Sequence, residues 1–417
     1  MAKSQEDNIK KLDVDTYKVS TNFFLKISIK GVELIPSIVN TIIIREYCDY
    51  IVPRLSLTII DSGVFLDNYP LEENDDIEIQ IGLDRDQSPL IATFMVECFN
   101  ITNTGGGTTY GNLLEISGIL KTTDLLKPNK TRSFGNIKSS DLISKIATEI
   151  GLKPDIRILS NDSMKWLQIN SNTYYFLKSV LERSYVSDDD VVLSYTQSDS
   201  KMVYTTLSKE IQSKVKYEAV FDNKETLNDI SESFEYNKKD GKDYIYFNDY
   251  EIINMSSIIN KAEGGYGDNL VYYEDGEEIT KTFSSNNHKL STHSNRLSKD
   301  LGRVTKVDFM GTSNSRNLHG NFFNSIIQNN RNYLDFFPNM LIINIKARTD
   351  LKLLEKVNIT LIGNGQEVNN VHSGEYLIGG IIYIGSSQNN LSMKLVLHRN
   401  GNNNKYSLLE PKDIKLA

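Results

Sequence analysis

Alternation of apolar and polar residues dominates the first part of the chain. From Ile77 to Leu83 every second residue is isoleucine or leucine, which is the period of a half-buried strand. The same reasoning predicts six strands, at 23–29, 39–47, 53–61, 75–83, 91–101 and 113–120. No helical period separates these strands, so residues 20–128 are predicted to form an antiparallel barrel or sandwich.

A helical period replaces the alternation after Pro128. The run Ser139-Ser140-Asp141 is suited to cap a helix, and Gly151 is suited to end it. Asn172 or Thr173 is suited to cap a second helix. The predicted elements are helices at 140–150 and from 173, a short strand at 156–159, and a hairpin at 191–195 and 202–207. Together they form a compact α/β unit.

The closing part of the chain returns to strands. Leu391, Met393, Leu395 and Leu397 alternate with other residues, and the apolar run 374–385 precedes them, so the pattern predicts a closing hairpin. Further predictions are strands at 244–248, 340–347 and 357–363, a helix at 317–333, and either a strand or a helix at 226–234. The two β regions share no obvious sequence repeat.

These elements give a fold that is mainly β with α+β insertions: two antiparallel β-barrels plus a small α/β domain. The expected division is an arm at 1–19, a first barrel at 20–128, an α/β region at 129–215 with 251–334, a discontinuous second barrel at 216–250 with 335–400, and a tail at 401–417.

Charge and cysteine usage narrow the functional class. The net charge of −8 argues against a duplex-DNA binder, which relies on a basic surface. Cys48 and Cys98 lie in apolar runs and are expected to be buried free thiols. With no leader and no apolar run of transmembrane length, we expect a soluble protein made in a reducing cytoplasm, without a membrane partner.

No catalytic, cofactor-binding or metal-binding residues are predicted. Gly105-Gly106-Gly107 is followed by a strand rather than a helix, which indicates a hairpin tip and not a phosphate cradle. His288 and His293 lack metal-ligand spacing. Asp188-Asp189-Asp190 is expected to be a solvated turn. Trp166 is either a core anchor beneath the following helix or an interface anchor.

Several blocks together resemble the central hub proteins of contractile phage baseplates. The blocks are the strand 53–61, the strand from Asp75, the helix at 140–150, the segment 166–177 beginning Trp-Leu-Gln-Ile-Asn, and the closing hairpin with Glu375-Tyr376-Leu377 and Leu395-Val396-Leu397. The resemblance covers most of the chain, although no single motif in it is diagnostic.

The resemblance implies two barrels similar to tail-tube subunits, which in a homotrimer form a pseudo-sixfold ring. Such a ring adapts a sixfold tail tube to a threefold central spike. Related secretion-system proteins fuse hub and spike, whereas here the spike is expected to be a separate chain. Expected partners are that spike, a tail-tube or tube-initiator protein and baseplate wedge components, with DNA only passing through the channel, in a virion tail baseplate. Edge strands are expected to make trimer contacts, and loops 62–74 and 102–112 axial contacts.

Two alternatives to a structural, non-enzymatic hub stay open. The tyrosine, asparagine and serine content also suits a carbohydrate-binding or adhesin-type β protein. An enzyme with dispersed catalytic residues at 250–330 is the other alternative.

Overall fold

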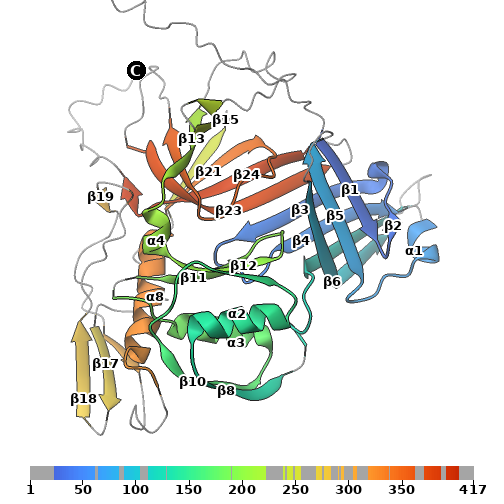
Figure 1. Ribbon diagram of the computed structural model, residues 1–417. Coiled ribbons are helices and arrows are strands. Elements are labelled where there is room, and N and C mark those ends of the chain that lie inside the picture. The colour runs from blue at the N-terminus through green and yellow to red at the C-terminus, as the bar shows by residue number, and fades with distance from the viewer. Residues whose placement is uncertain are drawn as a thin grey trace, which may run out of the picture.

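The computed structural model has the mainly β architecture that the sequence predicts (Figure 1). It describes residues 23–61, 64–83, 89–103, 111–127, 129–188, 190–221, 238–239, 242–247, 249–254, 269–274, 277–282, 290, 293–294, 304–307, 318–337, 339–361, 371–386 and 391–402. Two β-barrels share one continuous sheet, and a small α/β unit packs beneath them. The arm at 1–19, the glycine loop 105–107 and the segment 226–234 lie outside the described residues.

The first barrel is entirely antiparallel. Its elements are β1 (Phe23–Ile29), β2 (Val32–Glu33), a 3-10 turn (Pro36–Ile38), β3 (Val39–Tyr47), β4 (Arg54–Asp61), α1 (Val64–Asn68), β5 (Asp76–Leu83), β6 (Leu90–Asn103) and β7 (Asn112–Leu120). The strands follow the order β3-β4-β7-β6-β5-β1-β2. All six strands expected from the alternation are present, and Ile77, Ile79 and Ile81 are buried. The period-2 pattern therefore identified the inner face.

The α/β unit contains two main helices and two small sheets. Its elements are β8 (Lys130–Lys138), α2 (Ser139–Glu149), β9 (Lys153–Ile156), β10 (Ser163–Ser171), α3 (Thr173–Arg183), β11 (Val192–Thr196), β12 (Lys201–Thr206) and α4 (Leu207–Ile211). Strand β8 pairs with β10, and β12 lies between β11 and β9. Strand β8 was not predicted, because its sequence lacks an apolar alternation.

The cap of α2 differs from the prediction, whereas that of α3 agrees. No side chain at the N-cap of α2 bonds its backbone; instead Asp162, from the loop before β10, accepts bonds from Ser139 N (2.8 Å) and Ser139 Oγ (2.6 Å). The cap is therefore tertiary, and local sequence does not reveal it. Asn172 Oδ1 caps α3 by accepting from Tyr175 N at 2.9 Å.

The second barrel assembles strands from distant parts of the chain. They are β13 (Val215–Phe221), β14 (Lys238–Lys239), β15 (Lys242–Phe247), β16 (Tyr250–Asn254), β21 (Asn339–Lys346), β22 (Lys356–Thr360), β23 (Gly374–Ser386) and β24 (Leu391–His398). Most pairings are antiparallel, but β13 runs parallel to both β15 and β22. Strand β16 pairs with β21 and crosses the boundary expected at residue 250.

The remaining described elements lie beside these units. A three-stranded sheet contains β17 (Asn269–Glu274), β18 (Glu277–Thr282) and β20 (Val304–Val307). Two short strands, β19 (His293–Ser294) and β25 (Gly401–Asn402), pair with each other. Helix α8 (Phe322–Phe336) starts five residues later than predicted and packs beside the α/β unit, where Asn329 Nδ2 donates to Ser184 O at 2.9 Å (Figure 1).

The two barrels contain the same five-strand motif. Strands β3-β4-β7-β6-β5 are hydrogen-bonded in the same antiparallel order as β16-β21-β24-β23-β22. In each motif the long fourth strand has one unpaired residue at the same place, Glu97 in β6 and Gly379 in β23. The structure therefore contains an internal repeat that the sequence does not display.

The turns that precede β5 and β22, the equivalent strands of the two motifs, support this equivalence in their backbone geometry and hydrogen bonds. Asn74 has φ of 70° and Leu354 has φ of 63°. Asn74 N donates to Val96 O at 2.8 Å, and Leu354 N donates to Ile378 O at 2.7 Å. The next residue closes each turn with its carboxylate, since Asp75 accepts from Glu72 N and Glu355 accepts from Lys352 N.

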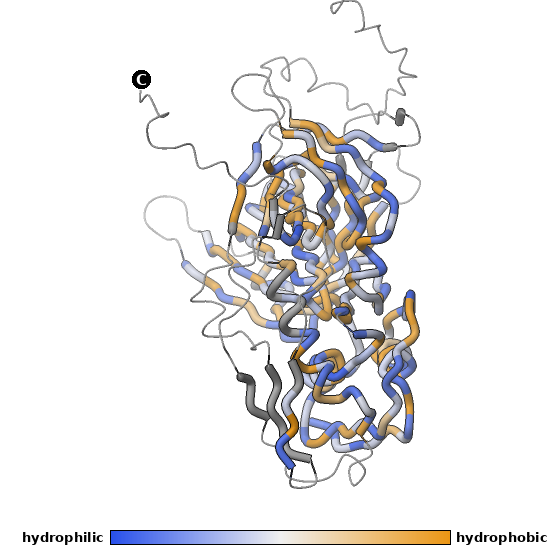
Figure 2. Tube along the Cα trace, turned by 90° about the vertical axis from the view of Figure 1, so that its left-hand side faces the viewer, coloured by the Kyte–Doolittle hydropathy of each residue, from blue (hydrophilic) through white to orange (hydrophobic). Residues whose placement is uncertain are grey.

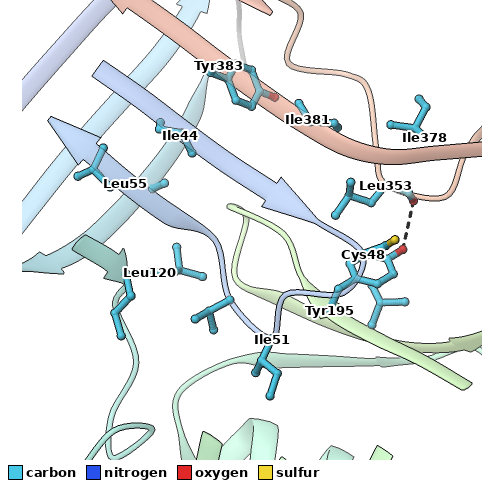
Figure 3. Packing of buried hydrophobic residues seen from close by; sticks show 14 of the residues in the cluster. Ile44, Cys48, Ile51, Leu55, Leu120, Tyr195, Leu353, Ile378, Ile381 and Tyr383 are labelled. Carbon is cyan, nitrogen blue, oxygen red and sulfur yellow. Dashed lines mark hydrogen bonds between the residues drawn. The ribbon is translucent and has the colours of Figure 1, made fainter. Parts of the chain in front are cut away.

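One hydrophobic core runs through both barrels and the α/β unit. Figure 2 shows hydrophobic and hydrophilic residues alternating along the barrel strands. Figure 3 shows where the three parts meet: Ile44 of β3, Tyr383 of β23 and Tyr195 of β11 lie in the same cluster. Tyr195 Oη donates to Leu353 O at 3.1 Å, which ties the α/β unit to the second barrel.

Candidate assembly surface

The junction between the barrels is a strand pairing. Strand β3 of the first barrel runs antiparallel to the second half of β23, with Tyr47 opposite Gly380, Ile44 opposite Tyr383 and Thr41 opposite Ser386. Cys48 N also donates to Gly379 O at 2.9 Å. Backbone pairing of this kind turns two barrel edges into one uninterrupted sheet.

Two glycines of β23 allow β3 to approach closely. A Cβ atom at Gly380 would lie 2.6 Å from the ring of Tyr47, and one at Gly385 would lie 2.8 Å from Ile42 Cγ2. Neither distance leaves room for a side chain. Gly380 and Gly385 in this apolar run are thus explained by the neighbouring barrel.

A buried carboxylate fixes the α/β unit to the same junction. Glu46 lies on β3 opposite Ile381 and is buried. Its Oε1 accepts hydrogen bonds from the Oγ and N of Ser198, in the β11–β12 turn. Burial raises the pKa of Glu46 from 4.5 to about 7, against the hydrogen bonds from Ser198, which lower it.

Among the described residues, no strand pairs with one edge of β6 over its second half. Its pairing with β5 ends at Met95, apart from a bond from Val96 N to Asp75 O, while its pairing with β7 continues to Asn103. Residues 98–103 are exposed on both faces. They include Phe99 (38% exposed) and Ile101 (46% exposed), opposite the buried Ile116 and Leu114.

Strand β16 leaves a second open edge, on the other barrel. Among the described residues, β16 pairs with β21 alone. Ile252 of this strand is 43% exposed. Open edges with exposed apolar side chains favour pairing with another strand.

Both segments expected to be loops with axial contacts contain regular secondary structure. Residues 102, 103 and 112 belong to the β6–β7 ladder, where Asn103 lies opposite Asn112, and 104–110 lie outside the described residues. Within 62–74, α1 occupies 64–68 and Leu71 is buried.

The cysteine and aspartate predictions need two corrections. Both cysteines are free thiols, but Cys98 is exposed, because it lies beyond the bulge at Glu97 where β5 no longer covers β6. Asp190 is buried rather than solvated and accepts bonds from Val191 N and Ser208 N at 2.8 and 3.1 Å. The alternation in the sequence could not show where a neighbouring strand stops.

Trp166 is a core anchor. It is buried, and its Nε1 donates to Ile137 O on β8 at 2.9 Å. Its burial excludes the alternative of an exposed interface anchor.

Within the described residues no group of three or more histidine, cysteine or acidic side chains is arranged to hold a metal ion. His288 lies outside them, and His293 belongs to β19. No described helix is long and apolar enough to span a membrane.

Comparisons with solved structures match nearly the whole chain. A 43 kDa tail protein of prophage MuSo2 from Shewanella oneidensis aligns with a TM-score of 0.55 and 12% identity, over 91% of this chain and 98% of that one. A tail protein from Neisseria meningitidis MC58 aligns with a TM-score of 0.54 and 9% identity, over 91% and 97%. The chain has the fold of phage tail proteins.

A third structure is less similar: a component of the type VI secretion system of E. coli aligns with a TM-score of 0.47 and 9% identity, over 89% of this chain and 76% of that one. No family model matches the chain, and no curated protein matches it in sequence. The two tail proteins thus share the overall architecture at an identity too low to carry individual residues across.

Proposed function

We propose that this protein is a structural hub of a phage tail baseplate, which acts as a homotrimeric ring between a sixfold tail tube and a threefold central spike. The observation that carries the proposal is the internal repeat. One chain holds two copies of a barrel motif side by side in one sheet, joined through β3 and β23.

This arrangement reconciles two symmetries. Three chains with two barrel motifs each present six similar barrels around an axis, while the α/β units repeat three times. A sixfold ring of tube subunits would stack on the six barrels. A spike chain would bind on the side where the α/β units repeat three times. Wedge components would surround the ring, and DNA would only pass along its axis.

The proposed mechanism is geometric and involves no catalysis. The protein would contribute a rigid surface, since the core is continuous through both barrels and the α/β unit. The likeness to whole-length phage tail proteins supports this class of function.

The mass of the assembled protein tests the proposal. Light scattering coupled to size-exclusion chromatography of the full chain is expected to give three times the 47.3 kDa chain mass, either alone or after addition of a spike protein from the same phage tail. A chain that stays monomeric under both conditions, or one that binds glycans as a monomer, would contradict a hub.

A further inference from the structure

The internal repeat assigns a partner to each of the two open edges. In the junction within the chain, β3 covers the edge of β23 that β22 leaves free. By the equivalence of the two motifs, β3 corresponds to β16, and β23 corresponds to β6. The open edge of β16 is thus equivalent to the edge of β3 that pairs at this junction, and the edge of β6 beyond Val96 is equivalent to the edge of β23 that pairs there. Neither open edge has a partner strand among the described residues.

We propose that β16 of one copy of this chain pairs antiparallel with residues 98–103 of β6 in the next copy, so that the junction between chains reproduces the junction within the chain. This strand pairing depends on the proposed hub function only for the number of chains in the assembly. Because the two edges differ, the contact is head-to-tail rather than an isolated twofold dimer, and the number of copies in the proposed hub requires it to close into a ring.

The register of this pairing follows from the bulges. Ile101 lies four residues beyond the unpaired Glu97, as Tyr383 lies four residues beyond Gly379. On the other edge, Ile252 lies opposite Leu341 as Ile44 lies opposite Leu55. Since Tyr383 faces Ile44 within the chain, Ile101 of one copy is expected to face Ile252 of the next.

The exposure of these side chains agrees with that register. Tyr383 and Ile44 are 3% and 1% exposed inside the chain, whereas their equivalents Ile101 and Ile252 are 46% and 43% exposed. Phe99 is likewise exposed at the place of the fully buried Ile381. Positions that are apolar and buried at the junction within the chain are therefore apolar and exposed at the two open edges. Pairing of these edges would remove the exposed side chains from water.

Disulfide trapping between two single-cysteine variants tests this register. Ile101→Cys and Ile252→Cys are made separately in a chain carrying Cys98→Ser, which removes the exposed native thiol and keeps the buried Cys48. Directly opposed residues of antiparallel strands lie within disulfide range. Oxidation is expected to give a covalent dimer when the two variants are mixed and none from either alone, while a chain carrying both cysteines forms a covalent ring.

The matched control replaces Ile101→Cys by Ile91→Cys, another exposed position on β6, in the half that β5 covers. This variant is expected to give no dimer with Ile252→Cys. Self-linking of Ile101→Cys alone would overturn the proposal, since it would place two β6 edges together.

A second measurement does not depend on oxidation. Ile101→Lys is expected to weaken self-association at least about tenfold, because pairing would bury the charge. Ile60→Lys is expected to leave it unchanged: Ile60 is also an exposed isoleucine, and the second motif carries Lys346 at the equivalent place. Equal effects of the two substitutions would contradict the assignment.

Failure of this pairing is distinguishable from failure of the hub function. A trimer in light scattering without a mixed disulfide would overturn the strand pairing and leave the hub function standing. A chain that is monomeric at every concentration, with and without the spike protein, and gives no disulfide would overturn both.

Discussion

At the scale of single residues, Glu46 combines full burial with a raised pKa. It is a carboxyl group buried between two barrels and the β11–β12 turn, and among the described residues its recorded donors both belong to Ser198. An ionised carboxylate in such a place costs more than two hydrogen bonds return. The pKa of about 7 means that the group is close to half protonated at neutral pH.

Glu46→Gln is therefore expected to change how stability depends on pH. Between pH 4.5 and about 7 the folded chain holds a proton on Glu46 that the unfolded chain has lost. The free energy of unfolding contributed by this group is thus largest below pH 4.5 and falls as the pH rises to 7, by up to about 3 kcal/mol. Urea denaturation of both proteins at pH 5, 6, 7 and 8 measures the difference.

The glutamine variant should gain stability relative to wild type from pH 5 to pH 8. Wild-type stability alone is a poor measure, because burial lowers the pKa of His398 to about 4. The free energy of unfolding that His398 contributes falls as the pH drops below 6.5, whereas the contribution of Glu46 rises in that direction. A difference between variant and wild type that does not change with pH would contradict the assignment.

At the scale of elements, β23 is the strand that joins the second barrel to the first. It pairs with β22, β24 and β3, and its bulge at Gly379 lets it change partners along its length. In the other motif the bulge residue is Glu97, whose carboxylate reaches Arg54 at 3.3 Å. The second motif needs glycine there because the ring of His398 fills the space.

Gly379→Ala is expected to destabilise the protein by at least about 1–3 kcal/mol, the usual cost of overpacking a core. The added Cβ would lie 2.1 Å from Cδ2 of His398, whose ring is held by an Nδ1 hydrogen bond to Phe337 O at 2.7 Å. Gly135→Ala on β8 is the control, since nothing lies within 4 Å of its Cβ position. Thermal unfolding of the two variants compares them directly, and equal midpoints would show that the ring moves aside freely.

At the scale of the whole molecule, the two barrels and the α/β unit behave as one packed body. Their buried side chains form one cluster, and the Glu46–Ser198 and Tyr195–Leu353 bonds cross between the parts. A shared core makes it costly to unfold one part while the others stay folded.

The protein is therefore expected to unfold in a single transition. Trp166 is the only tryptophan and reports on the α/β unit, whereas far-ultraviolet circular dichroism reports mainly on the barrels. The two signals should give the same denaturation midpoint. An earlier fluorescence transition would show instead that the α/β unit unfolds independently.

The sequence by itself determined most of the strands and helices, because strand and helix periods are properties of neighbouring residues. Leu55, Leu57 and Ile59 on β4, and Leu341, Ile343 and Ile345 on β21, show their buried face without any tertiary information. The sequence also placed the cap of α3 at Asn172 or Thr173, whereas it left Trp166 open between a core and an interface position, which the structure decides.

Only the tertiary structure decided which edges meet, because hydrogen bonding between strands does not depend on side-chain identity. The same turn is built from Leu-Glu-Glu-Asn-Asp at 71–75 and from Leu-Lys-Leu-Leu-Glu at 351–355, so the repeat is carried by backbone register rather than by sequence. For that reason the exposure of Cys98, the burial of Glu46 and the two open edges were not predictable from the pattern of residues.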